Sequence, residues 1–183
     1  MKMKTLIIYS SKYGYTKKYA HWLAEELNGD IFETKNVKKN IMSGYDVIIL
    51  GGGLYAGRIK GINLLVKNFE KIKDKKIILF TCGIADYNNI KNINSVRKGL
   101  ENAIPKNVLE KTKLFHLRGG INYKELNVLH QMIMGMVKKV LSKKGADELT
   151  QENKDLLETF GQTLDFTDKK NITEIIEYCK GIT

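Results

Sequence analysis

The chain has 183 residues, of which 43% are hydrophobic and 28% charged, proportions that predict one globular domain and exclude a disordered chain. No apolar stretch approaches the roughly 20 residues that a transmembrane helix needs, and the two cysteines make no disulfide framework, so we expect a cytoplasmic protein. The net charge of +11 favours anionic partners such as acidic lipid or carboxylate-bearing small molecules, and without a recognisable nucleic-acid module we expect no nucleic-acid partner.

Short apolar runs, suited to buried strands, alternate with segments of helical spacing along the chain. The first strand pattern, TLIIY, precedes a helical segment in which Tyr19, Leu23 and Leu27 share one side and Thr16 is the candidate N-cap. In chain order, we expect strands at 5–9, 30–34, 46–50, 76–80 and 113–117, and helices at 16–27, 62–69, 95–104, 126–141, 150–160 and 173–180.

This alternation predicts βαβ units, and therefore an α/β fold with a parallel sheet covered by helices on both faces. Five strands with helical crossovers fit the doubly wound order 2-1-3-4-5. We expect residues 1–183 to form a single domain, with an insertion at about 121–166 after the last strand. Ligands of such sheets bind beyond the carboxyl ends of the strands, where this sequence places glycine, hydroxyl and tyrosine residues.

The first of these strand ends, SSKYGYT at residues 10–16, leads into a predicted helix. Hydroxyl groups and backbone N–H groups at a helix N-terminus form an anion site, and Gly14 lets the backbone curl around the anion. The Walker pattern GxxxxGK[ST] is absent from the sequence, which argues against NTP hydrolysis. Taken alone, the segment is equally consistent with an ordinary polar turn that carries a threonine cap.

The second and third strand ends are glycine-rich and carry tyrosine. Residues 51–58 read GGGLYAGR, in which three glycines allow close backbone approach to a flat ligand and Tyr55 is positioned to stack on a ring. Residues 81–87 read TCGIADY. There Tyr87 is a candidate ligand contact or a surface aromatic, and Cys82 is more typical of a small core residue than of a nucleophile. A phosphate cradle beside two flat, tyrosine-bearing loops predicts a phosphorylated flat heterocycle, and FMN is the natural candidate.

The segment from Tyr9 to Thr16, YSSKYGYT, resembles the phosphate loop of flavodoxins, and the resemblance extends over essentially the whole chain. It implies that the FMN phosphate is bound by Ser10, Lys12, Tyr13, Gly14, Tyr15 and Thr16. It also implies that the isoalloxazine is flanked by Gly53, Leu54, Tyr55, Ala56 and Gly57 on one side and by Thr81, Cys82 and Gly83 on the other.

Within that family, the opening KTLIIYSSKYGYT and a long apolar and basic insertion, residues 123–144, are similar to the menaquinone-dependent protoporphyrinogen IX dehydrogenases of heme biosynthesis. The resemblance implies an FMN-dependent oxidoreductase that passes electrons from a protoporphyrinogen-like substrate to a quinone-type acceptor. The alternative is an electron carrier between partner proteins, although typical flavodoxins are acidic and this chain is basic. A binding module without a flavin is the least favoured alternative, because the three strand ends together have the composition of a flavin site.

The insertion has two open interpretations. Its apolar residues at helical spacing, its three methionines and the lysines at its end suit an interfacial helix that meets quinone, a hydrophobic substrate or the anionic inner face of the membrane. The second interpretation is a helix buried in the hydrophobic core of the protein, because helices that are apolar nearly all round are usually buried. We expect no catalytic side chain and no metal site, since His21, His116 and His130 share no ligand spacing and a flavin supplies its own chemistry.

Overall fold

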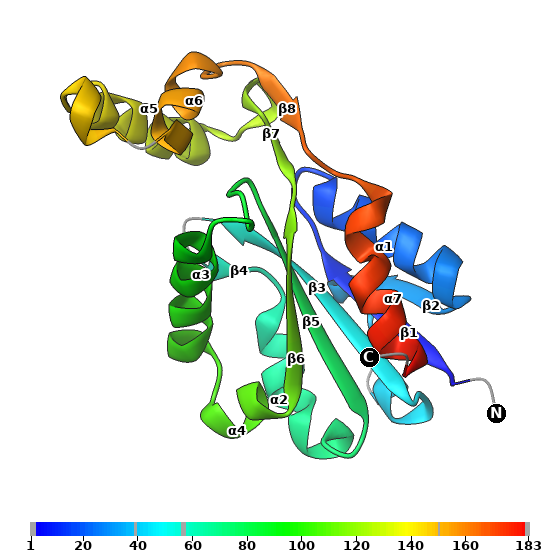
Figure 1. The fold of residues 1–183 in the computed structure, drawn as a ribbon. Helices are drawn as coiled ribbons and strands as arrows, with labels where there is room; N and C mark the ends of the chain where they lie inside the picture. Colours follow the sequence, from blue (N-terminus) through cyan, green and yellow to red (C-terminus); the bar gives the residue numbers. More distant parts are fainter. Residues whose placement is uncertain (1–2, 39, 56–57, 150, 182–183) are drawn as a thin grey trace. The chain divides into compact units, whose positions relative to one another are not determined.

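The computed structural model describes residues 3–38, 40–55, 58–149 and 151–181. The chain forms two compact units (Figure 1). The first, here called the sheet unit, consists of Met1–Gly119 and Phe166–Thr183, and the second, the inserted unit, of Gly120–Asp165. The insertion was expected at about 121–166. Within the described residues, no helix is long and apolar enough to cross a membrane.

The sheet unit is built on five parallel strands whose order, β2-β1-β3-β5-β6, confirms the doubly wound order predicted from the sequence. A two-stranded hairpin is added where β4 pairs antiparallel with the end of β3. The strands are β1 Thr5–Ser10, β2 Asp30–Glu33, β3 Val47–Tyr55, β4 Arg58–Ile59, β5 Lys76–Gly83 and β6 Thr112–Arg118.

Helices cover both faces of this sheet and enclose two separate cores, as expected for strands with apolar residues on both sides. One core lies against α2 and α3 and includes Leu65, Phe69 and Leu100. The other lies against α1 and α7 and includes Tyr19 and Ile175. The helices of the sheet unit are α1 Tyr15–Leu27, α2 Ile62–Ile72, α3 Ile90–Ala103, α4 Lys106–Glu110 and α7 Thr173–Lys180.

The structure corrects several predicted boundaries. The glycine run 51–53 is part of β3, and residues 81–83 are part of β5, because both segments keep pairing with their neighbours in the sheet. Helix α1 begins at Tyr15 with Gly14 as its N-cap, so the prediction that Thr16 is the cap was wrong. Helix α3 begins five residues before the expected start, because the Asn89 side chain accepts a hydrogen bond from the backbone N–H of Lys91.

The inserted unit consists of a short antiparallel strand pair and two helices. Its elements are β7 Gly120–Asn122, α5 Val128–Leu141, α6 Gln151–Glu158 and β8 Thr163–Asp165. The Asn127 side chain caps α5 by accepting from the His130 N–H. Phe160 holds the unit together, because its ring lies 4.7 Å from that of Tyr123 and the Lys138 ammonium lies 4.4 Å from the ring centre.

The sheet unit also contains the two points at which the chain leaves for the inserted unit and returns from it. The Phe166 N–H donates to the Gly119 carbonyl at 2.9 Å. The fully buried Tyr19 hydroxyl donates to the Arg118 carbonyl at 2.7 Å and accepts from the Asp168 N–H and the Asn171 side-chain amide. The residues that precede and follow the inserted unit are therefore held side by side in the sheet unit.

Candidate functional site

The three predicted site segments meet at one edge of the sheet, because their strands are parallel and in register. Ser10 of β1 pairs with Gly52 of β3, and Gly52 pairs with Thr81 of β5. One residue further along, Gly53 pairs with Cys82. The chain segments that follow β1, β3 and β5 thus leave the sheet from adjacent positions, as the carboxyl-end rule for this fold requires.

The segment after β1 has the geometry of an anion cradle. Gly14 has φ +91°, a left-handed conformation that other residues adopt only with strain, and a Cβ at this position would meet nothing within 4 Å. The N-cap of α1 makes no side-chain capping hydrogen bond, and the N-terminus of a helix favours an anion. The Ser11 hydroxyl accepts from the Gly14 N–H at 3.1 Å, which holds the turn in shape.

The first hydroxyl and the last threonine of this segment are buried, with Ser10 5% exposed and Thr16 2% exposed. Tyr15 begins α1 and packs against the core that α1 covers. Lys12 and Tyr13, two of the six residues implied as phosphate ligands, contact Tyr55 of the second segment.

Tyr55, at the end of β3, joins the second segment to the first. Its hydroxyl accepts a hydrogen bond from the Lys12 backbone N–H at 2.9 Å, and the Tyr13 ring meets its ring edge to face at 5.8 Å. Burial raises the pKa of Tyr55 above its ordinary value, so the phenol stays neutral. Gly53 makes room for this ring, since a Cβ there would lie 2.7 Å from it. Ala56 and Gly57, also implied as flavin contacts, lie outside the described residues.

The third segment is held against the second by close contacts. The Tyr87 hydroxyl and the Leu54 side chain both lie against Gly83, whose Cβ would be 2.7 Å from that hydroxyl oxygen and 3.3 Å from Leu54. Glycines 53 and 83 are therefore each covered by a tyrosine of their own segment. Backbone and tyrosine rings therefore pack together at these two strand ends.

Thr81 and Cys82 turn their side chains away from that surface. Thr81 is fully buried and its hydroxyl lies 2.7 Å from His116 Nδ1 on β6, while Cys82 is 5% exposed and packs into the core beside Leu117. These two residues can meet a ligand only through their backbone groups. Burial raises the pKa of the second cysteine, Cys179, to about 11, so its thiol is unreactive at neutral pH.

Residues of β6 support the third segment, and the sequence-based reasoning missed this role. Arg118 Nε donates to the Ile84 carbonyl at 3.2 Å, its guanidinium lies 4.0 Å from the Asp86 carboxylate, and it stacks 3.8 Å from the Phe166 ring. The His116 ring lies 5.4 Å from that of Tyr87. The only available signal was that Arg118, one of three arginines, directly follows the predicted strand 113–117.

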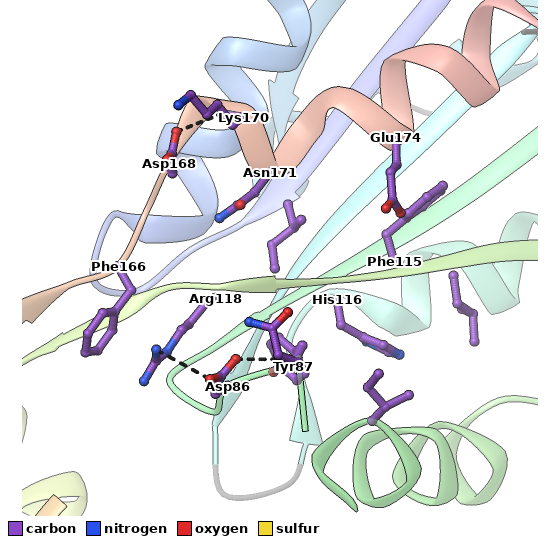
Figure 2. A pocket seen from close by; sticks show the side chains of 14 residues that line it. Asp86, Tyr87, Phe115, His116, Arg118, Phe166, Asp168, Lys170, Asn171 and Glu174 are labelled. Carbon is purple, nitrogen blue, oxygen red and sulfur yellow. Dashed lines mark hydrogen bonds and ion pairs between the residues drawn. The ribbon is translucent and has the colours of Figure 1, made fainter. Parts of the chain in front are cut away.

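These side chains line a groove of about 740 Å³ along the edge strand β6. Figure 2 shows Asp86, Tyr87, His116 and Arg118 on one side of β6 and residues of the segment leading into α7 on the other. The groove therefore lies between the third segment and the residues that lead into α7, alongside β6. Further lining residues are Asp168, Lys170, Asn171 and Glu174.

His116 makes the stability of the sheet unit depend on pH. Burial lowers the pKa of His116 below its ordinary value of about 6.5, so that between the two values the unfolded chain binds more protons than the folded one. The stability is therefore complete above about pH 6.5 and falls as the pH drops toward the folded pKa. We expect His116→Gln, which keeps a hydrogen-bond partner for Thr81, to lose stability less steeply than the wild type in urea unfolding between pH 7.5 and 5. Parallel curves for the two proteins would contradict this prediction.

Among the described residues, no group of three or more histidine, cysteine, aspartate or glutamate side chains is placed to hold a metal ion. The arrangement at the strand ends is one that binds and orients a flat, phosphorylated molecule through backbone, glycine and tyrosine.

Comparison with known proteins agrees with this architecture. A model of the flavodoxin domain matches residues 6–150. An uncharacterized protein of Methanocaldococcus jannaschii is 37% identical over 83 residues, which make up 44% of this chain and 55% of that protein, so the match spans about half the length of the relative.

Several solved structures are similar at low sequence identity. A flavoprotein in complex with FMN from Lactobacillus acidophilus is 14% identical, with a TM-score of 0.44, and the match covers 63% of this chain and 92% of that one. The flavodoxin of Megasphaera elsdenii is 14% identical, with a TM-score of 0.44 and coverage of 61% and 82%. Because the domain model matches well over half of its residues, the chain belongs to the flavodoxin domain family.

Proposed function

We propose that the protein binds one FMN at the three strand ends and is a redox protein that works through this flavin. The observation that carries the proposal is that the strand ends bring together a helix N-terminus without a side-chain capping bond, at Gly14, and two glycines, Gly53 and Gly83, each covered by a tyrosine. Membership of the flavodoxin domain family supports the same cofactor. When bound, FMN supplies the reversible uptake of a hydride or of electrons.

The chain's own residues bind and orient the cofactor. The N–H groups around Gly14 and the first turn of α1 would hold the phosphate, because a helix N-terminus favours an anion. Tyr55 and Tyr87 would flank the ring system and exclude water from it, with Arg118 and His116 fixing the position of the segment that carries Tyr87.

We propose further that the protein is an oxidoreductase that passes electrons from a protoporphyrinogen-like substrate to a quinone-type acceptor. The positive net charge supports this substrate class, since propionate carboxylates are attracted to a basic protein. The alternative is an electron carrier with no substrate of its own, which the same flavin site would serve equally well.

Two measurements test these proposals separately. The purified protein, titrated with FMN, should give a yellow complex of one flavin per chain, and failure to bind FMN would overturn the whole assignment. Anaerobic incubation of that complex with protoporphyrinogen and a menaquinone analogue should then oxidise the porphyrinogen. A protein that binds FMN but does not oxidise the porphyrinogen would instead favour the electron-carrier function.

Thr16→Ala should weaken FMN binding. Thr16 lies in the first turn of α1, and a hydroxyl that donates to a phosphate contributes about 1–3 kcal/mol. Thr16→Ser, which keeps the hydroxyl, should bind FMN with nearly the wild-type affinity, as measured by quenching of flavin fluorescence. If the alanine and serine variants bind equally well, the phosphate does not contact this side chain.

A further inference from the structure

Helix α5 of the inserted unit carries a row of exposed apolar side chains. Among the described residues, seven large apolar side chains are strongly exposed, and five of them lie on this helix with 58–73% of their surface accessible. Large apolar groups gathered in this way mark an interaction site more often than scattered ones do. The five residues, here called the α5 stripe, are Val128, Leu129, Met132, Met136 and Val140.

The α5 stripe is separate from the side of the helix that packs within the inserted unit. At 100° per residue, its members fall within about 120° of the helix circumference. Leu141, which is buried, and the half-buried Ile133 and Val137 lie outside this arc, and Lys138 packs on Phe160 of the inserted unit. The stripe is therefore not required for the packing of its own unit.

The charged side chains of α5 itself are lysines, Lys138 and Lys139, whereas residues 120–165 as a whole contain six lysines and seven acidic residues. Lys139 falls within the same arc, near the C-terminal end of the helix, and Lys143 follows just after the helix ends at Leu141; both side chains are exposed. Residues 126–146 contain four lysines and no acidic residue. A helix of 14 residues, about 21 Å long, thus presents apolar side chains along one face and ammonium groups at one end of that face.

We propose that the α5 stripe lies in the interface of an anionic phospholipid membrane. The apolar side chains would enter the boundary between headgroups and acyl chains, and the lysines would reach anionic headgroups, as in other interfacial helices. A second copy of the chain fits less well, because stable protein interfaces bury about 800 Å² on each partner, more than one row of five side chains provides. The proposal depends on neither FMN nor turnover.

Vesicle binding tests the proposal directly. The wild-type protein should cosediment with vesicles that contain phosphatidylglycerol at least about tenfold more strongly than with pure phosphatidylcholine vesicles, and added salt should weaken the binding. Met132→Asp/Met136→Asp should reduce the binding at least about tenfold, because it places charge in the apolar row. Ile90→Asp is the matched control, since Ile90 is 63% exposed but belongs to α3 of the sheet unit, and it should bind like the wild type.

A labelling experiment gives an independent reading. Both native cysteines are buried, so a cysteine introduced as Met136→Cys can be labelled selectively with an environment-sensitive dye. Its emission should shift to the blue on addition of anionic vesicles, whereas a dye on Ile90→Cys should not respond.

Three results would overturn the proposal. They are a wild-type protein that does not bind anionic vesicles at low salt, equal loss of binding in the α5 and Ile90 variants, and a concentration-dependent dimer that Met132→Asp/Met136→Asp abolishes while the wild type ignores vesicles. FMN affinity, measured on the same samples, should stay unchanged throughout. A failure of this proposal is thereby distinguished from a failure of the flavin assignment.

Discussion

Gly53→Val should raise the dissociation constant for FMN by at least about 100-fold, equivalent to about 2.7 kcal/mol, while the protein remains folded. A Cβ at residue 53 would lie 2.7 Å from the Tyr55 ring, so valine pushes that ring off its hydrogen bond with the Lys12 N–H. A displaced Tyr55 ring would no longer flank the flavin as proposed. Stability should change little, because Tyr55 is only half-buried and its ring can move outward.

Gly51→Val is the matched control for this result. Gly51 lies in the same strand and on the same side of the sheet, but its Cβ would overlap the ring of Phe80, which is fully buried. The ring cannot move without disturbing the core, so this variant should lose about 3 kcal/mol of folding stability. Thermal unfolding of the apo proteins and FMN titration of both variants provide the comparison. If Gly53→Val unfolds as readily as Gly51→Val while keeping its FMN affinity, Gly53 has a structural role only.

Replacing residues 120–165 with a short glycine- and serine-rich turn should leave a folded protein that binds FMN but oxidises no substrate. The ends of the replaced segment are adjacent, because Gly119 and Phe166 share a backbone hydrogen bond. Both cores of the sheet unit consist entirely of residues from Met1–Gly119 and Phe166–Thr183. All of the described candidate FMN contacts belong to the sheet unit as well, so we expect the inserted unit to decide what the flavin reacts with.

The FMN spectrum, circular dichroism and anaerobic turnover of this shortened protein test the division of roles. Loss of the fold or of FMN would mean that the inserted unit is part of the flavin-binding structure. Full retention of porphyrinogen turnover would mean that it is irrelevant to the substrate.

Most of the fold could be predicted because its strands carry strong local signals. The strands centred on Ile7, Ile48 and Ile78 are continuous apolar runs, and such runs separated by helical segments allow few topologies. The ends of β3 and β5 could not be placed, because glycine is uncommon in strands and the sequence suggests a turn where the sheet continues. Pairing with neighbouring strands outweighs this local preference.

The residues at the strand ends stand out in the sequence, whereas the residues of β6 that contact them do not. The glycines and tyrosines after the strands have a recognisable composition, and the structure brings the described ones together at one edge of the sheet. The contacts of His116 with Thr81 and of Arg118 with Ile84 join residues 34 or 35 positions apart and depend on the register of β6 against β5. No local pattern reports such a register. The pairing of β7 with β8, three residues each and about 40 positions apart, was missed for the same reason.

The position of α7 has a consequence for how the protein is made. This last helix packs against the first, and the Tyr19 hydroxyl binds residues 149 and 152 positions away. A contact over such a distance forms late, since closing a long loop costs entropy and slows folding. On the ribosome, the sheet face that carries Ile7 and Ile49 therefore stays without the cover of Ile175 and Cys179 until synthesis has passed the inserted unit. During that interval, the nascent chain exposes the kind of apolar surface to which chaperones bind.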